Sequence, residues 1–257
     1  LDDLGQPVAR YTIVDLSGTL RERQRQALAA HGNRVRWVDA LPSALQGVVV
    51  GNEVLDAMPV KLLARVGGTW FERGVALSDD GALLWRDRAT DLRPPVEVPG
   101  DDDYLSEIHP QAEAFMRTLA DALRRSDKGG LALFIDYGFP EAEYYHPQRH
   151  MGTVMCHRAH LSDANPLVDV GAKDITAHVN FTGVALAAQD AGLDVLGYGS
   201  QGRFLINCGL AERTLAATLA DRAQAQKLIL EHEMGELFKV LIVGRVNAAP
   251  PGWGPLG

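Results

Sequence analysis

The sequence is poor in cysteine. Its 257 residues include only Cys156 and Cys208, which lie far apart and form no CxxC pair. A disulfide framework or a zinc site built from cysteines is therefore not expected, and a reducing compartment suits the protein better. Glycine-rich phosphate-binding loops are also missing. No GxGxxG motif precedes Arg10, and the glycine-rich stretch 197–202 does not open a strand–helix–strand unit.

Long apolar runs and an excess of basic residues are missing as well. No run reaches the ~18 residues that a membrane-spanning helix needs, and no signal peptide is visible. The 25 lysines and arginines against 33 acids give a net charge of -8, which argues against a general nucleic-acid-binding protein. The chain starts at Leu1 without an initiator methionine, so we expect it to be the interior of a longer protein.

What the sequence does contain is the pattern of an α/β protein. Apolar strands are predicted over 10–15, 33–39 and 47–53, with a helix over 19–32 between the first two. Helices and strands continue to alternate in the rest of the chain. Helices are predicted over 106–129, 176–191 and 210–232, and strands over 131–136, from 193 and over 237–245. This order predicts a mostly parallel sheet.

Changes in the residue pattern along the chain predict how it divides into segments. We expect a core over 1–59 and 105–247, interrupted by antiparallel hairpins over 60–104, where alternation and turn signals appear. A loop insertion is expected over 140–173, which shows no clear period, and a flexible tail over 248–257.

Carboxylates follow several of the predicted strands. Asp15, Asp39, Glu53 and Asp136 each stand at or just past a strand end. In an open parallel sheet the carboxyl ends of the strands line the ligand crevice. Asp15 fits the acid that accepts hydrogen bonds from the two hydroxyls of a ribose. That role does not separate a nicotinamide cofactor from S-adenosylmethionine.

Two further positions extend this predicted cofactor site. Asp39, followed by Ala40, could contact an adenine, with the carboxylate accepting from the exocyclic amine. The stretch "GVVVGNEVLDAMPV" places Asn52, Glu53 and Asp56 where a buried strand ends. We predict that these three side chains form the reaction centre.

Asp174 and His178 form a further candidate pair, four residues apart at a predicted helix start. Such a pair can hold a metal on one helix face, but no third ligand is fixed by spacing. A helix cap at Asp174 or a role in substrate binding explains the pair better, and we predict no metal site.

Six segments, in order along the chain, carry a family resemblance: "YTIVDLSGTLRERQ", "GNEVLDAMPV", "LALFIDYG", "DITAHVNF", "QGRFL" and "MGELFKVL". With these the chain resembles the MidA-type S-adenosylmethionine-dependent methyltransferases, relatives of the mitochondrial complex I assembly-factor arginine methyltransferases. The resemblance implies a class I, Rossmann-like methyltransferase fold whose first strand and glycine-rich loop are missing here. It also implies S-adenosylmethionine as methyl donor, S-adenosylhomocysteine as product, and protein arginine methylation linked to respiratory complex assembly.

The resemblance also suggests partners and residue roles. The expected partners are a protein substrate and a second copy of the chain, in a bacterial cytoplasm or a mitochondrial matrix. Glu53 and Asp56 would bind the guanidinium group of the substrate arginine, and Asn52 would orient the donor or the substrate. Asp136, Tyr137, Asp174 and His178 are further candidates for substrate binding. Three alternatives stay open: a small-molecule methyltransferase, a non-catalytic assembly factor that keeps the fold, and a nicotinamide oxidoreductase.

Overall fold

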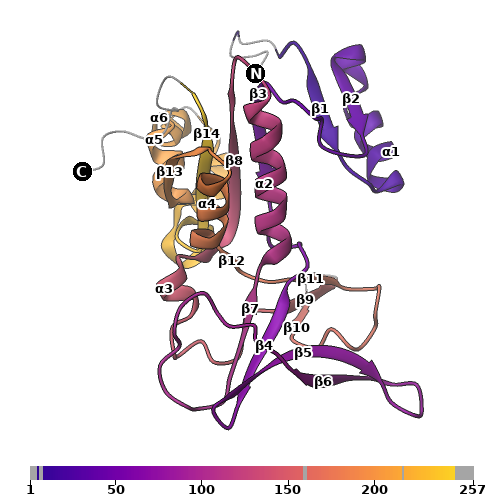
Figure 1. The fold of residues 1–257 in the computed structure, drawn as a ribbon. Coiled ribbons are helices and arrows are strands. Elements are labelled where there is room, and N and C mark those ends of the chain that lie inside the picture. Colours follow the sequence, from indigo (N-terminus) through magenta and orange to yellow (C-terminus); the bar gives the residue numbers. More distant parts are fainter. Residues whose placement is uncertain (1–4, 6–7, 159–160, 216, 247–257) are drawn as a thin grey trace.

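The computed structural model describes residues 5, 8–158, 161–215 and 217–246, and Figure 1 shows their arrangement. The predicted tail 248–257 lies outside the described residues. None of the helices in these ranges combines the length and the apolar character that a bilayer crossing requires. The elements form a central mixed sheet with helices, a small N-terminal strand–helix–strand unit, and two antiparallel sheets at one end of the central sheet.

The central sheet confirms the predicted α/β class. Its strands are β3 (Gly47–Asn52), β8 (Gly130–Phe139), β14 (Phe238–Arg245), β13 (Asp194–Ser200) and the short β12 (Val179–Asn180). β3 and β12 run parallel to β8, whereas β14 is antiparallel to both β8 and β13. One reversed strand therefore lies inside an otherwise parallel sheet. β8 runs to Phe139, so Asp136 lies within the strand and not at its predicted end.

Helices α2 (Pro110–Arg124) and α4 (Phe181–Asp190) pack against each other and bury the main core. Pro110 occupies the first turn of α2, where its missing N–H costs nothing. The core includes Met116, Leu119 and Leu123 of α2, which repeat at helical spacing and pack with Phe134 of β8. This periodicity is why the α2 helix was visible in the sequence.

The segment after β13 forms several short helices where one long helix is predicted. It contains α5 (Gln201–Asn207), α6 (Leu210–Leu215), α7 (Leu219–Ile229) and the helical turn η3 (Glu231–Gly235). The predicted single helix over 210–232 is wrong, because α6 ends at Leu215 and Thr218 starts α7 as its cap, accepting a hydrogen bond from the Asp221 N–H.

The N-terminal unit consists of β1 (Tyr11–Val14), α1 (Gly18–Ala27), the 3-10 turn η2 (Ala29–Arg34) and β2 (Val35–Val38), with β1 parallel to β2. Ser17 caps α1, through its hydroxyl and the Leu20 N–H, so the helix begins one residue before the predicted start at position 19. Among the described residues, no strand pairs with the free edge of β1 or with the edge of β3 opposite β8. Val48 and Val50 on β3 are each 66% exposed. The expectation of a further strand at this place stays a prediction.

The predicted hairpins over 60–104 are part of a four-stranded antiparallel sheet. It contains β4 (Lys61–Val66), β5 (Thr69–Leu77), β6 (Leu83–Ala89) and β7 (Tyr104–Ile108), in the order β6-β5-β4-β7. Gly67 and Gly68 both have positive φ values, which the tight turn between β4 and β5 requires. Residues 106–108, predicted to open the α2 helix, belong to β7 instead.

The stretch predicted as a loop over 140–173 is partly ordered into elements. It holds α3 (Glu141–Tyr144), β9 (Met155–Arg158) and β10 (Leu161–Asp163), and with β11 (Asp174–Thr176) it forms a three-stranded antiparallel sheet. These strands are three or four residues long and mostly exposed. They lack the apolar alternation that makes a strand visible in a sequence.

Candidate active site

The turn that follows β3 carries the predicted reaction centre. The Glu53 N–H donates to the Ile135 carbonyl at 2.9 Å, so the β3–β8 pairing continues into the turn. Glu53 has a φ of +50°, a left-handed conformation that costs a residue other than glycine about 1 kcal/mol or more. Its side chain is exposed, and the Asn52 amide donates to Glu53 Oε1 at 3.3 Å. A strained backbone at the mouth of a sheet is a common feature of functional sites.

Asp136 fixes the shape of this turn from the neighbouring strand. Its Oδ2 atom accepts the backbone N–H groups of Val54, Leu55 and Asp56 at 3.1, 2.9 and 3.3 Å. Its Oδ1 atom accepts the Tyr137 N–H at 3.0 Å. Both oxygens of the Asp136 carboxylate therefore accept hydrogen bonds from the protein, and the residue is only 1% exposed. This geometry makes Asp136 a positioning residue and does not place it in direct contact with a substrate.

Two buried carboxyl groups meet beneath the turn. Burial, together with the Asp56 carboxylate, raises the pKa of Asp136 to about 7. Burial also raises the pKa of Asp56, which is 4% exposed, and the Asp174 carboxylate adds to that effect. Among the described residues, nothing donates a hydrogen bond to Asp56 Oδ1. The pair is thus disposed to hold one proton near neutral pH.

An aromatic cluster lies beside these acids, at the carboxyl end of β8. The Tyr137 ring lies 5.3 Å from His178 and 5.4 Å from Phe238, and Phe139 lies 5.2 Å from His178, all between ring centroids. Burial lowers the pKa of His178 to about 4, so its imidazole is neutral at pH 7. Burial raises the pKa of the Tyr137 hydroxyl, and the adjacent Asp56 contributes. The sequence-predicted residues Asp56, Asp136, Tyr137 and His178 therefore do come together.

The predicted helical arrangement of Asp174 and His178 is wrong. Asp174 is exposed on β11, whereas His178 precedes α4 and is largely buried. Asn180, not Asp174, caps α4, and its Oδ1 atom accepts the Gly183 N–H at 3.2 Å. The two residues lie on different elements, so their spacing does not create a shared helix face. Asp174 still influences the site, through its effect on the pKa of Asp56.

The predicted cofactor residues Asp15, Asp39 and Ala40 lie on the N-terminal unit. Asp15 accepts the Ser17 N–H at 2.8 Å and the Gln24 amide at 2.8 Å, and these bonds lower its pKa. Asp39 is exposed and pairs with Arg21 at 2.7 Å. Each Asp15 oxygen keeps lone pairs for further donors, so an ionised Asp15 fits a ribose diol. These residues are not part of the Asn52–Asp56 turn, and no strand pairing among the described residues joins the two groups.

A second buried polar network adjoins the site and was not predicted. Glu107 is fully buried on β7, and its oxygens accept the Thr153 and Val154 N–H groups at 2.7 and 3.2 Å and the Tyr144 hydroxyl at 2.8 Å. The Thr153 hydroxyl in turn accepts the His178 backbone N–H at 3.0 Å. The network joins the four-stranded sheet to the aromatic cluster. The single charged residue of the "YLSEI" strand was the available signal.

Residues 3–199 match the model of a family described as "Putative S-adenosyl-L-methionine-dependent methyltransferase". The match covers more than half of the chain. The chain belongs to this methyltransferase family. In solved structures it is similar to a Burkholderia thailandensis protein bound to S-adenosyl-homocysteine, with a TM-score of 0.89, 44% identity, and coverage of 99% of this chain and 69% of that one. A native structure of an uncharacterised protein from the same organism has a TM-score of 0.90 at 46% identity, with 99% and 71% coverage.

Two curated relatives of this methyltransferase chain are named as protein arginine methyltransferase NDUFAF7 homologues, mitochondrial. The Caenorhabditis elegans protein is 27% identical over 79% of this chain and 48% of its own length. The Drosophila melanogaster protein is 30% identical over 84% of this chain and 52% of its own length. The chain thus spans about half the length of the curated relatives it matches. S-adenosylmethionine is the cofactor of the family, which confirms the cofactor that the resemblance implied.

Proposed function

We propose that this chain acts as an S-adenosylmethionine-dependent methyltransferase on arginine side chains of proteins. The observation that carries the proposal is the Asn52–Asp56 turn, in which Glu53 has a strained backbone and an exposed side chain. Family membership supports methyl transfer, and the names of the two curated relatives support arginine as the acceptor.

In methyl transfer the protein mainly positions the two reactants, because the methyl donor is already activated. Bound S-adenosylmethionine supplies an electrophilic methyl group on a sulfonium, and a guanidinium nitrogen attacks it in line. A guanidinium is a weak nucleophile because its lone pairs are delocalised. Glu53 would accept hydrogen bonds from two of its N–H groups, which draws the positive charge toward the bound nitrogens and leaves lone-pair density on the nitrogen that attacks the methyl group. Asp15 would accept from the ribose hydroxyls of the donor, and Asp39 and Ala40 would lie near its adenine.

The residues around Glu53 have separate tasks in this proposal. Asn52 holds the Glu53 carboxylate through its amide, at 3.3 Å. Asp136 keeps the turn in shape, and Asp56, with its raised pKa, would take the proton that the methylated nitrogen releases. Tyr137 and His178 form an aromatic wall beside the acids and would limit the access of water. Asp174, on the exposed side, would contact the acceptor.

Incubation of the full-length protein with methyl-tritiated S-adenosylmethionine and a cell lysate tests the proposal. Acid hydrolysis of the labelled protein fraction should release methylated arginine, and the Glu53→Gln protein should release far less. Label in small molecules alone would support the small-molecule alternative. The absence of label in both fractions would support a non-catalytic assembly factor.

A link to respiratory complex assembly, as the family resemblance implies, would follow from the identity of the labelled protein. Mass spectrometry of the labelled band gives that identity. A labelled subunit of a respiratory complex supports the link, and a labelled protein of another kind contradicts it while leaving arginine methylation in place.

A further inference from the structure

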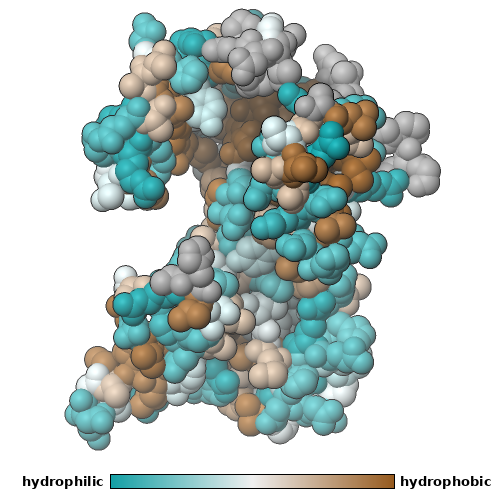
Figure 2. All heavy atoms as spheres, turned by 180° about the vertical axis from the view of Figure 1, so that it is seen from behind, coloured by the Kyte–Doolittle hydropathy of each residue, from teal (hydrophilic) through white to brown (hydrophobic). Residues whose placement is uncertain are grey.

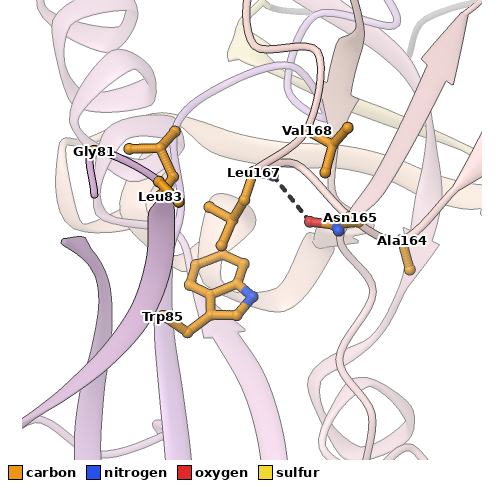
Figure 3. Close-up of a pocket in the computed structure, with 8 residues that line it drawn as sticks. Gly81, Leu83, Trp85, Ala164, Asn165, Leu167 and Val168 are labelled. Atoms are coloured by element: carbon orange, nitrogen blue, oxygen red, sulfur yellow. Dashed lines mark hydrogen bonds between the residues drawn. The ribbon is translucent and has the colours of Figure 1, made fainter. Parts of the chain in front are cut away.

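An apolar groove lies on the inserted sheet, away from the acids of the candidate site. It separates the end of the β5–β6 ribbon from the loop between β10 and β11, and its volume is about 590 Å³. Figure 3 shows Leu83 and Trp85 on the ribbon and Leu167 and Val168 on the loop around the groove. The Leu167 N–H donates to Asn165 Oδ1 at 3.1 Å, which stabilises the turn of that loop.

One face of the ribbon extends the apolar surface beyond the groove. The register pairs Val75 with Trp85 and Leu77 with Leu83, so these four side chains share a face. Val75 is 55% exposed, Leu77 70% and Trp85 38%. Figure 2 shows hydrophobic residues at the surface of the inserted region as well as in the hollow higher up. A contiguous apolar surface with a partly exposed tryptophan is typical of a binding site for a protein segment.

The segments that line the groove carry charge of one sign. Residues 78–85 and 161–172 contain four aspartates and neither lysine nor arginine. Two of these aspartates are paired with bases of neighbouring elements, Asp163 with Lys173 at 2.8 Å and Asp169 with Arg158 at 3.2 Å.

The other two aspartates, Asp79 and Asp80, lie at the tip of the ribbon. Across the described ranges, neither forms an ion pair with a lysine or arginine. The Ser78 hydroxyl and the Ala82 N–H donate to Asp80 and hold its pKa below the ordinary value, so this carboxylate is ionised at neutral pH. The groove therefore combines apolar lining residues with two acids at the ribbon tip, next in sequence to its lining residue Gly81.

We propose that this groove docks an extended, basic segment of the acceptor protein. An apolar side chain of the segment would lie between Trp85 and Leu167, and an arginine or lysine beside it would meet Asp79 and Asp80. The inference rests on the proposed function, since the docked segment belongs to the acceptor protein. Only residues 57–60 separate the active-site turn from β4 of the inserted sheet, so a docked segment lies on the insertion that borders the site.

The size of the groove fits a short segment of a transient partner. A stable pair of proteins buries about 1,200 Å² or more of surface, whereas a groove of this volume holds only a few side chains. Main-chain pairing is also available, because β6 is an edge strand of its sheet. Addition of a peptide strand to such an edge is a recurring mode of peptide recognition.

The test is fluorescence anisotropy of the full-length protein with a labelled eight-residue peptide in which arginine alternates with leucine. Control peptides carry aspartate in place of arginine, or serine in place of leucine. We expect binding of the first peptide alone. Trp85→Ser and Val168→Ser, on opposite walls, should each weaken it about tenfold. The double change Asp79→Asn and Asp80→Asn should weaken it about fivefold and reduce its salt dependence.

Two matched variants at exposed positions away from the groove control for general effects. Leu219→Ser, on α7, and Asp127→Asn, after α2, should leave peptide binding unchanged. Thermal unfolding of each variant shows that it is folded. Equal binding by the wild-type protein and Trp85→Ser, or no binding by the wild-type protein, would overturn the proposal. So would a wild-type dimer that Trp85→Ser converts to a monomer, because a second copy would then occupy the groove.

The outcomes separate this inference from the proposed function. If the lysate experiment yields methylated arginine while the groove variants bind the peptide normally, the groove proposal alone fails. If peptide binding follows the groove variants but no methylated arginine forms, the proposed function alone fails.

Discussion

Asp136 Oδ2 lies 2.9 Å from the backbone nitrogen of Leu55, although 81 positions separate the two residues. This bond and its neighbours connect the middle of the sheet to the turn that carries Glu53. A carboxylate that satisfies three consecutive backbone N–H groups sets the direction of the chain at that point. The position of Glu53 is thus decided by a residue on another strand.

Glu53→Gln should abolish most methyl transfer in the full-length protein while donor binding stays intact. The amide keeps the size of the side chain but loses the charge that would bind the guanidinium. We expect a decrease in kcat of about 100-fold, equivalent to roughly 2.7 kcal/mol of barrier. Glu97→Gln, at an exposed loop position, is the control. A Glu53→Gln enzyme with the wild-type rate would show that Glu53 has no catalytic task.

Glu53→Gly should stabilise the fold while it removes activity. Glycine adopts the observed φ of +50° without steric cost, so the strain of the turn is relieved. Its greater freedom in the unfolded chain offsets part of the gain, which leaves an increase of up to about 1 kcal/mol in the free energy of unfolding. Urea denaturation measures this change. A clear loss of stability would indicate that the Glu53 side chain, not its backbone, matters to the fold.

Asp136→Asn should change how stability depends on pH. The folded-state pKa of Asp136 is about 7 against an ordinary value of 3.8, so protonation favours the folded state. Its contribution is full below pH ~4 and is lost as pH rises through 7. The wild-type free energy of unfolding should therefore fall relative to Asp136→Asn between pH 4 and 7, by at most about 4 kcal/mol. Parallel stability curves for the two proteins over that range would contradict the assignment.

Glu107→Ala should destabilise the fold by about 3 kcal/mol, because it leaves the Thr153 and Val154 N–H groups buried without an acceptor. Glu107→Gln should cost less than about 1 kcal/mol, since its carbonyl can accept both groups and its amide can donate to the Tyr144 hydroxyl. Chemical denaturation of both variants gives the comparison. Equal losses would mean that the negative charge of Glu107, and not its hydrogen bonds, stabilises the network.

Several features were readable in the sequence because they depend on local pattern. The run of valines in β3 has the composition of a strand, and the helical repeat of Met116, Leu119 and Leu123 buries an apolar face of α2. Paired glycines at 67 and 68 require a turn for the same local reason. The acids around Glu53 were also found from the abrupt change in polarity after β3.

Other features were not readable, because they depend on contacts between distant segments. The short strands β9 to β11 carry little apolar alternation, so pairing alone defines them. Asp174 and His178 have helical spacing, yet neighbouring strands extend the backbone there and separate the two.

The sequence by itself determined the α/β class, the main elements and the family, since periodicity and local motifs are properties of neighbouring residues. Only the tertiary structure decided which environment, and so which role, each of these acids has. Asp136 is buried and serves the turn, Glu53 is exposed and strained, and Asp56 lies between them without a partner for one oxygen among the described residues. The three acids differ in burial and in hydrogen bonding across strands. Neither property can be read from the residue type in the sequence.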